Sequence, residues 1–220
     1  MSKEKTDIII LDDGFQHQYV KRDLNILLTD FSNPFYKDSV LPKGGLREHR
    51  KGAERADIII VTKCPKDISP AIENEIKKRI SCYSSATIFF TNISYETPIN
   101  HLNNKTSIDS KKKYLLITSI ANPYPIYEHL NENNIQFTTK KYRDHHNFTK
   151  TQIQEIIKIG VQYDAIITTE KDWMRLKETE LVNVVSLDIL RLRINMEFIY
   201  SKENLKFKDQ ITSLINKTTP

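Results

Sequence analysis

The sequence predicts an α/β fold in which a parallel sheet is followed by a second, smaller α/β domain. Short β-branched runs alternate with amphipathic helical segments along the chain, which is typical of parallel sheets covered by helices. Carboxylates and glycines follow several of these runs directly, and open α/β sheets bind their ligands at the carboxyl ends of strands. A chain of 220 residues is long enough to bury a sizeable core.

The first series contains four expected strands and one expected helix. The strands are Asp7–Leu11, Leu24–Leu28, Asp57–Val61 and Thr87–Phe90, and the helix is Ser69–Ile80. The run that ends at Leu11 is continuously apolar, as in a central parallel strand. A polar stretch rich in Asn, Ser, Thr and Lys then marks a boundary, so we expect a first domain over residues 1–95 and a linker over 96–112.

The second series predicts a compact α/β domain over residues 113–220. Its expected strands are Tyr114–Thr118, Ile135–Lys140, Ala165–Thr169 and Val184–Leu187, with helices at Tyr124–Asn131 and Thr149–Ile159. Arg191–Tyr200 alternates charged and apolar residues like an exposed strand, and Glu203–Ile215 is expected to close the chain as a helix.

Composition narrows the class of partner. A net charge of +5 and a pI near 9.0 favour an anionic partner, but aromatic residues are not interleaved with basic ones as nucleic-acid stacking requires. The sequence shows no signal peptide, and no apolar run approaches the roughly 20 residues of a membrane span. Any membrane contact is therefore expected to be peripheral. Cys64 and Cys82 share no metal-type spacing, which favours a cytoplasmic chain with two incidental thiols.

The most informative segment is Asp12-Asp13-Gly14-Phe15-Gln16-His17, directly after the first apolar run. Acidic residues at this position commonly hold Mg²⁺ against a nucleotide phosphate. Successive residues on a strand point to opposite faces, so we expect only one of the two carboxylates to bind the metal directly. A turn in which both Asp residues cap the following segment is an equally good interpretation.

Two loops could carry further chemistry. Leu41–Glu48 sets two glycines beside an Arg-Glu pair, a composition suited to anion binding, although a surface loop with a local ion pair is the better interpretation of it alone. Tyr142–Phe148 sets His145 and His146 beside Asp144, which favours a proton relay over a metal site. A helix cap from Asp144 or Asn147 with exposed histidines explains the second loop equally well.

Two strand ends complete the candidates. Thr168–Asp172 is expected to cap a helix in preference to contacting a ligand. Ser119–Pro123 follows the strand that ends at Thr118 and opens a helix, where backbone N–H groups favour anions.

Taken together, these segments resemble the tetraacyldisaccharide 4'-kinases, which phosphorylate the 4'-position of an acylated disaccharide 1-phosphate with ATP in lipid A biosynthesis. The resemblance runs from Asp7 to about Leu187 and rests on matched segments in matched order. These are Asp12–His17, Arg22–Leu24, Asp30 with Asn33–Phe35, Leu41–Glu48, Arg55–Asp57, Ile120–Pro123, Asp144–His146 and Thr168–Asp172.

The resemblance implies part of a P-loop NTPase-type parallel sheet followed by a smaller α/β domain, with a site in the cleft between them. It implies that Asp12 and Asp13 are the acidic pair near Mg²⁺ and that Glu48 is a further carboxylate associated with the metal. It also implies that Arg47 stabilises charge on the transferring phosphoryl group.

The resemblance further implies that Gln16 and His17 lie near the bound ATP. It implies that His145 orients a catalytic aspartate, which takes the proton from the sugar hydroxyl. The expected partner is the acylated disaccharide 1-phosphate lipid, reached by peripheral contact at the cytoplasmic face of the inner membrane.

One departure from the family pattern concerns ATP. The phosphate-binding pattern G-x-x-x-x-G-K-[ST] does not occur in the sequence, so the chain alone is expected to have little kinase activity, and a separate segment could supply the P-loop. Two other functions are open on the residues alone. One is a metal-dependent phosphohydrolase that uses Asp12, Asp13 and His145, and the other is a non-catalytic protein that binds anionic lipid.

Overall fold

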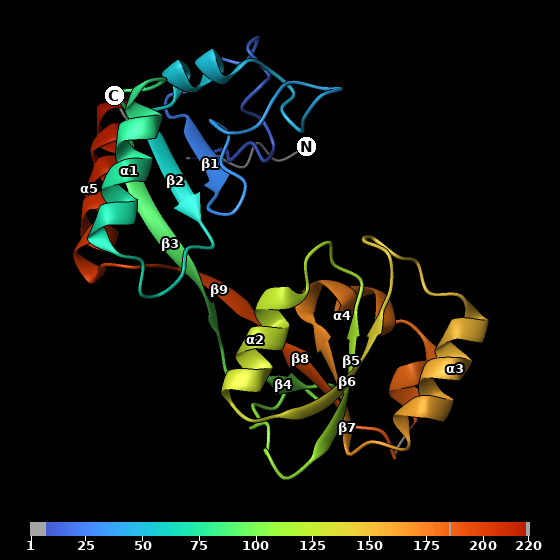
Figure 1. Cartoon of the computed structure of the whole chain (residues 1–220). Coiled ribbons are helices and arrows are strands. Elements are labelled where there is room, and N and C mark those ends of the chain that lie inside the picture. The colour runs from blue at the N-terminus through green and yellow to red at the C-terminus, as the bar shows by residue number, and fades with distance from the viewer. Residues whose placement is uncertain (1–7, 185, 219–220) are drawn as a thin grey trace. The chain divides into compact units, whose positions relative to one another are not determined.

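The structure is a computed structural model that describes residues 8–184 and 186–218 (Figure 1). The chain forms two compact units. The first contains the chain up to Ile93 and again from Met196 onward, and the second contains Ser94–Asn195. The chain therefore leaves the first unit once and returns to it.

The first unit is built on a four-stranded sheet with strand order β1-β2-β3-β9, in which β1, β2 and β3 are parallel (Figure 1). Its strands are β1 (Ile26–Asp30), β2 (Ile58–Thr62), β3 (Thr87–Tyr95) and β9 (Ile194–Phe198). Its helices are η1 (Arg50–Arg55), a short 3₁₀ helix, α1 (Pro70–Ser81) and α5 (Ser201–Thr218).

Helices on both faces explain the apolar character of this sheet. Neighbouring strand residues point to opposite faces, and β3 shows this with two adjacent rings. Phe90 packs in the cluster that includes Ile76 and Ile80 of α1, whereas Phe89 contacts Phe207 of α5 with 5.5 Å between ring centroids. A sheet buried on both faces needs continuous apolar strands, as in Ile58–Thr62.

The second unit is built on a five-stranded sheet with strand order β4-β8-β7-β5-β6. Strands β5 to β8 are parallel, and β4 pairs antiparallel with β8. The strands are β4 (Ile99–Asn100), β5 (Lys113–Thr118), β6 (Gln136–Lys141), β7 (Ala165–Thr169) and β8 (Ile189–Leu192). The helices are α2 (Tyr124–Glu132), α3 (Lys150–Gly160), α4 (Glu170–Leu176) and η2 (Glu180–Asn183), which is a 3₁₀ helix.

Strand β5 divides the core of this unit into two layers. Leu115 and Ile117 pack with Ile156 of α3 on one face, whereas Leu116 packs with Leu130 of α2 on the other. The parallel pairing of Ile117 with Thr168 places the carboxyl ends of β5 and β7 side by side. The loops after these two strands therefore start close together.

Two expected strands do not form. Residues 8–11 are irregular and exposed, with Ile9 and Ile10 more than four-fifths accessible, and Asp7 lies outside the described residues. A strand requires a hydrogen-bonded neighbour, and among residues 8–184 and 186–218 the strand β1 pairs with β2 alone. The strand expected at 184–187 does not form either: η2 ends at Asn183, Ser186 lies in a turn, and β8 starts at Ile189, where pairing with Ile166 begins. Val185 lies outside the described residues.

The expected domain division needs correction at both ends of the second unit. The segment 96–112 is part of that unit and contributes β4 rather than forming a linker. The closing helix α5 belongs to the first unit rather than to 113–220. The reason is packing, because Phe207 covers Phe89 and Gln210 donates a hydrogen bond of 2.9 Å to Thr87 Oγ1.

No helix among the described residues is both long and apolar enough to cross a membrane. The two thiols are both free, with Cys64 buried and Cys82 exposed.

Candidate active site

The acidic pair lies in a tight turn in the first unit. Asp12 Oδ1 accepts the backbone N–H of Asp13 at 3.0 Å, and Asp13 has φ of 50°. This is the left-handed region, which Asp tolerates better than most residues. Both carboxylates are exposed. Asp12 and Asp13 therefore lie in a turn, but the Asp13 carboxylate pairs with Arg47 instead of capping the following segment. The metal role of the pair stays a prediction.

The Arg-Glu pair in the following loop does not form a local ion pair. Arg47 Nη1 instead lies 2.6 Å from Asp13 Oδ2, and both side chains are more than half exposed. Glu48 Oε1 lies 2.6 Å from Arg55 Nη2 in a less exposed pair. Each residue of the expected local pair thus reaches another segment, and Arg47 connects its loop to the acidic turn.

The two glycines of this loop serve its own folding. The Asp38 carboxylate accepts the backbone N–H groups of Ser39 and Gly45 at 2.7 and 3.0 Å. A Cβ on Gly44 would overlap that carboxylate and the Ser39 backbone. The glycines therefore let the loop wrap around Asp38, and this explains them without a bound anion.

Two further arginines donate hydrogen bonds to backbone carbonyl oxygens next to the acidic turn. Arg22 Nη1 donates to the carbonyl oxygens of Gly14 and Phe15 at 2.6 and 3.1 Å. Arg55 donates to the Phe15 carbonyl at 3.4 Å, and its guanidinium lies 4.9 Å from the centroid of the Phe15 ring. Both arginines belong to segments that carry the family resemblance, but sequence reasoning gave neither a role. Only the folded loops show that they hold the turn.

A shallow pocket in the first unit brings three of the predicted site residues together, namely Gln16, Arg47 and Glu48. Its lining residues are Phe15, Gln16, Leu27, Phe35, Leu46, Arg47, Glu48, His49, Arg50 and Ala53. His17 is exposed on the acidic turn and does not line this pocket. Gln16 therefore lines this pocket and His17 does not, and the expectation that both lie near ATP stays a prediction.

The predicted metal ligands are not assembled into one cluster. Within residues 8–184 and 186–218, no three His, Cys, Asp or Glu side chains are grouped so that they could hold a metal ion. Asp12, Asp13 and Glu48 consequently do not form a three-ligand site. Mg²⁺ usually takes only one or two protein carboxylates together with water and phosphate oxygens, so the prediction of Mg²⁺ stays untested.

Asp30 stands at the carboxyl end of β1, in one of the segments that carry the resemblance. Its Oδ2 lies 2.7 Å from Lys63 Nζ, and its Oδ1 accepts the backbone N–H and the hydroxyl of Ser32 at 2.8 and 2.6 Å. Burial raises the pKa of Asp30, but the hydrogen bonds from Lys63 and Ser32 outweigh burial and bring that pKa below 3.8. Sequence reasoning assigned this carboxylate no role.

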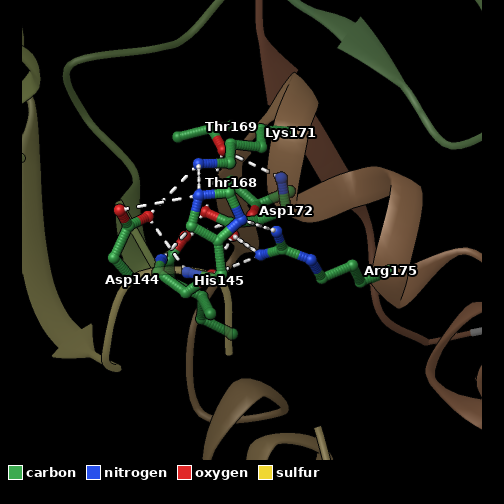
Figure 2. Close-up of polar contacts among 9 residues, drawn as sticks. Asp144, His145, Thr168, Thr169, Lys171, Asp172 and Arg175 are labelled. Carbon is green, nitrogen blue, oxygen red and sulfur yellow. Dashed lines mark hydrogen bonds and ion pairs between the residues drawn. The ribbon is translucent and has the colours of Figure 1, made fainter. Parts of the chain in front are cut away.

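His145 lies at the centre of a second cluster, in the second unit (Figure 2). Its ring contacts two cationic side chains of α4: Arg175 Nη2 lies 3.3 Å from Nδ1, and Lys171 Nζ lies 3.3 Å from Nε2. Asp144 Oδ2 lies 3.8 Å from Nε2. Lys171 also donates to Asp144 Oδ1 at 3.2 Å, and this hydrogen bond lowers the pKa of Asp144. His145 therefore lies beside one carboxylate and two cations, and its role toward a catalytic aspartate stays a prediction.

A buried carboxylate lies beneath this cluster (Figure 2). Asp172 is fully buried. It accepts the Ser119 N–H at 2.9 Å, the Ser119 hydroxyl and the Thr169 hydroxyl at 2.8 Å. Arg175 Nη1 donates to Ser119 Oγ at 3.0 Å and lies 3.5 Å from Asp172 Oδ1. One guanidinium thus joins the buried network to the exposed histidine.

The neighbouring histidine has a different surrounding. His146 stacks on Tyr142 with ring centroids 4.9 Å apart, and its Nε2 lies 2.9 Å from Gln152 Oε1. Gln152 and Thr149 form the capping box of α3, so the helix cap expected from Asp144 or Asn147 comes instead from Thr149. His146 is a packing residue at that cap, and only His145 is exposed.

Helix capping at Thr168–Asp172 is confirmed, because Thr169 caps α4 and accepts the backbone N–H of Asp172 at 3.0 Å. The contribution of Arg175 was missed. A signal for it existed in the sequence, since residues four apart share one face of a helix and Lys171 and Arg175 have this spacing. The hydrogen bonds from Ser119 had no such signal, because Ser119 lies more than 50 residues from Asp172.

Comparison with known proteins decides the family. The family model described as tetraacyldisaccharide-1-P 4'-kinase matches residues 1–216. The chain belongs to this kinase family. The tetraacyldisaccharide 4'-kinase of Flavobacterium psychrophilum is 40% identical over 214 residues, which cover 95% of this chain and 62% of that protein. The enzyme of Bacteroides thetaiotaomicron is 36% identical over 232 residues, covering 97% of this chain and 60% of that protein.

This chain spans about three fifths of the length of these relatives. A solved structure of LpxK from Aquifex aeolicus in complex with ATP is 22% identical to it, with a TM-score of 0.60, and the match covers 93% of this chain and 56% of that one. This likeness, to a P-loop kinase fold, confirms the predicted α/β fold class with its parallel sheets.

Proposed function

We propose that this chain takes part in transferring the γ-phosphoryl group of ATP to the 4'-hydroxyl of a tetraacyldisaccharide 1-phosphate in lipid A biosynthesis. The observation that carries the proposal is the family match over residues 1–216. The segments that gave the sequence resemblance also fold into two polar clusters, one around Arg47 and one around His145. The family match favours a kinase over a phosphohydrolase or a non-catalytic lipid-binding protein.

The residues of the first cluster fit a nucleotide phosphate with Mg²⁺. Carboxylate oxygens are the protein ligands that Mg²⁺ prefers, and Asp12 and Asp13 offer them on an exposed turn. Glu48 offers another beside Gln16 in the shallow pocket. When bound, the metal would neutralise charge on the phosphate oxygens. We assign Asp12, Asp13 and Glu48 to Mg²⁺, and Gln16 and His17 to the nucleotide.

Arg47 is assigned to the phosphoryl group that moves. Its guanidinium is a planar, permanently charged donor that suits phosphate oxygens, and it is more than half exposed. Its Nη1 lies 2.6 Å from Asp13 Oδ2, one of the carboxylates assigned to the metal. A charged donor at the transferring group stabilises charge that spreads over its oxygens in the transition state.

The second cluster is assigned to the sugar hydroxyl. In the transfer, the bond from the γ-phosphorus to the bridging oxygen of ADP breaks and a bond from phosphorus to the sugar 4'-oxygen forms. The hydroxyl proton passes to a carboxylate. His145 orients that carboxylate, as a carboxylate–imidazole pair can.

The lipid acceptor determines the proposed location of the protein. A lipid with acyl chains stays in a bilayer, so we propose peripheral contact with the cytoplasmic face of the inner membrane. The net charge of +5 favours an anionic surface. We further propose that a segment carrying the G-x-x-x-x-G-K-[ST] pattern supplies the backbone donors for the β- and γ-phosphates, because this sequence holds no such pattern.

A chimeric enzyme tests the proposal. This chain replaces the matching 214 residues in the Flavobacterium psychrophilum enzyme, and the product is assayed with labelled ATP and tetraacyldisaccharide 1-phosphate in detergent micelles. We expect acceptor-dependent phosphate transfer by the chimera and at least a hundredfold less by the 220-residue chain alone, since positioning supplies most of such catalysis.

The chimera with Arg47→Ala and Glu48→Gln together is the matched inactive control. A folded chimera with no transfer above this control would refute the proposal. Release of phosphate from simple esters with Mg²⁺ and no ATP would instead favour a phosphohydrolase.

A further inference from the structure

We infer that the second unit binds a phosphate group at the carboxyl edge of its sheet, through the exposed cations Arg143, Lys150 and Lys171. All three side chains belong to this unit, so the binding does not depend on the first unit. The inference rests on the proposed function only for the source of the phosphate, which is either the 1-phosphate of the sugar acceptor or ATP.

Parallel pairing brings the three cations to one edge. Strands β5, β6 and β7 are parallel neighbours, so their carboxyl ends meet there. The loop that leaves β6 carries Arg143 and leads to Lys150, the first residue of α3. Lys171 is the second residue of α4, which starts directly after β7. Open α/β sheets bind their ligands at this edge.

The exposed charge at this edge is mostly positive. In residues 142–150 and 170–172 the exposed charged side chains are Arg143, Lys150 and Lys171 on one side and Asp144 on the other. Arg143 and Lys150 form no ion pair with any residue that the structure describes, and Lys171 pairs with Asp144 at 3.2 Å. Three exposed cations therefore share one exposed carboxylate.

The two other acids of the same segments are already engaged. Asp172 is buried and lies 3.5 Å from Arg175 Nη1. Glu170 Oε1 lies 3.4 Å from Nη1 of Arg191, which is itself buried. Neither carboxylate is therefore left to neutralise the exposed cations.

Lys171 has hydrogen-bond donors left over (Figure 2). Its ammonium carries N–H donors and no acceptor. Asp144 accepts one of them, and His145 Nε2 lies 3.3 Å from Nζ. Arg175 lies at the same 3.3 Å from the other ring nitrogen, and a neutral imidazole has one acceptor nitrogen for these two cations. Arg175 also donates to Ser119 Oγ. An oxyanion beside Lys171 would supply the acceptor that the ring cannot offer to both cations.

Lys150 stands where a cation is unfavourable. The amino end of a helix carries partial positive charge, which disfavours a cation in the first turn. Helix α3 has no acidic residue in its first turn to compensate Lys150. A bound anion would remove this repulsion.

Phosphate fits these donors better than a carboxylate does. A phosphate monoester carries about two negative charges and three acceptor oxygens near neutral pH. Arg143 offers a planar donor, and the two lysines offer point charges on flexible stems. The first unit's Arg47 is assigned to the transferring phosphoryl group, so the 1-phosphate of the acceptor has no other assigned partner.

NMR of the 220-residue chain tests the site. The imidazole signals of His145 report on it, because the ring lies 3.3 Å from Lys171 Nζ, and His145→Asn assigns these signals. The protein is titrated with inorganic phosphate, glucose 1-phosphate or ATP without metal, each at constant ionic strength. We expect saturable shifts with a Kd of about 1 mM for inorganic phosphate, as for a few exposed charge-assisted contacts.

Two double variants with the same change in charge separate a site from general positive charge. Lys150→Gln with Lys171→Gln removes cations at the amino ends of α3 and α4. Lys158→Gln with Lys177→Gln removes exposed cations at the carboxyl ends of the same two helices. We expect the first to weaken phosphate binding by about tenfold or more and the second to leave the Kd within about twofold.

Shifts that do not saturate up to about 50 mM phosphate, or equal Kd values in the two double variants, would overturn the inference. If the first double variant does not fold, Arg143→Gln decides, because this exposed side chain holds no other described group. Tighter binding of glucose 1-phosphate than of ATP would support the site and identify the acceptor as the source. The reverse order would support the site and identify the nucleotide.

Kinetics of the chimera connect the site to the reaction. Lys150→Gln with Lys171→Gln is expected to raise the KM of the substrate whose phosphate binds here by about tenfold, whereas Lys158→Gln with Lys177→Gln leaves both KM values unchanged. Unchanged KM values in the first variant would overturn the role in the reaction. An inactive chimera would refute the proposed function, and the NMR titration would still decide the phosphate site.

Discussion

Arg47 Nη1 lies 2.6 Å from Asp13 Oδ2, so a direct ion pair connects two segments that are 34 residues apart in the sequence. Both side chains are more than half exposed, and exposed ion pairs add at most about 1 kcal/mol to folding stability. The pair therefore contributes little to the stability of the first unit.

Arg47→Ala separates the proposed role in catalysis from this small contribution to stability. In the chimera we expect kcat to fall about a hundredfold or more, because a charged donor to the transition state is lost. We expect the free energy of unfolding to change by less than about 1 kcal/mol. Lys51→Ala, which removes an exposed cation from the neighbouring η1 helix, is the control and should alter neither quantity. Equal losses of kcat in the two variants would show that only general positive charge matters.

His145→Asn and His146→Asn form a matched pair of neighbouring substitutions. His145 is exposed and has a left-handed backbone that Asn tolerates, so its variant should lose kcat by about a hundredfold with little change in stability. His146 stacks on Tyr142 and contacts Gln152, so its variant should lose about 1 kcal/mol of stability with kcat nearly unchanged. Assays of the chimera and urea unfolding of this chain check both. The opposite pattern would assign the orienting role to His146.

Asp30 predicts a dependence of stability on pH. Its hydrogen bonds from Lys63 and Ser32 outweigh the effect of burial, so the pKa of this carboxyl group is lower in the folded protein than the ordinary value of 3.8. A lowered pKa stabilises the fold at pH values above the unfolded pKa, and that stability is lost as the pH falls from about 4 through the folded pKa.

Urea unfolding between about pH 6 and pH 2 measures this contribution. Asp30→Asn should destabilise the protein near neutral pH and show a shallower loss of stability below about pH 4 than the wild type. Asp67→Asn, at an exposed position of the same unit, should follow the wild-type curve. Identical slopes for Asp30→Asn and the wild type would contradict the role of Asp30.

Two isoleucines of α1 test the packing of the first unit. Ile80 is fully buried among the residues that cover one face of the sheet, whereas Ile72 is 45% exposed. Ile80→Ala should cost about 2–5 kcal/mol because it removes buried methyl groups and leaves a cavity. Ile72→Ala should cost less than about 1 kcal/mol. Similar losses in the two variants, measured by urea unfolding, would show that α1 does not pack on the sheet as described.

Much of the fold was predictable from local patterns. The helices at α1, α2 and α3 and the strand β7 lie within two residues of their expected bounds, because capping residues and apolar periodicity are local signals. Ile8–Leu11 shows where such signals fail: the run is apolar enough for a buried strand but pairs with no strand in the part of the chain that the structure describes. Pairing is a property of the neighbours, which composition does not report.

The sequence by itself determined the family, the α/β class and the candidate segments, because those depend on residue types in a fixed order. Only the tertiary structure decided how the segments meet. It paired Arg47 with Asp13 rather than with Glu48, and it placed Arg175 between the buried Asp172 and the exposed His145. The physical reason is that hydrogen bonds and ion pairs form over about 3 Å in space, whatever the number of residues that separates the partners along the chain.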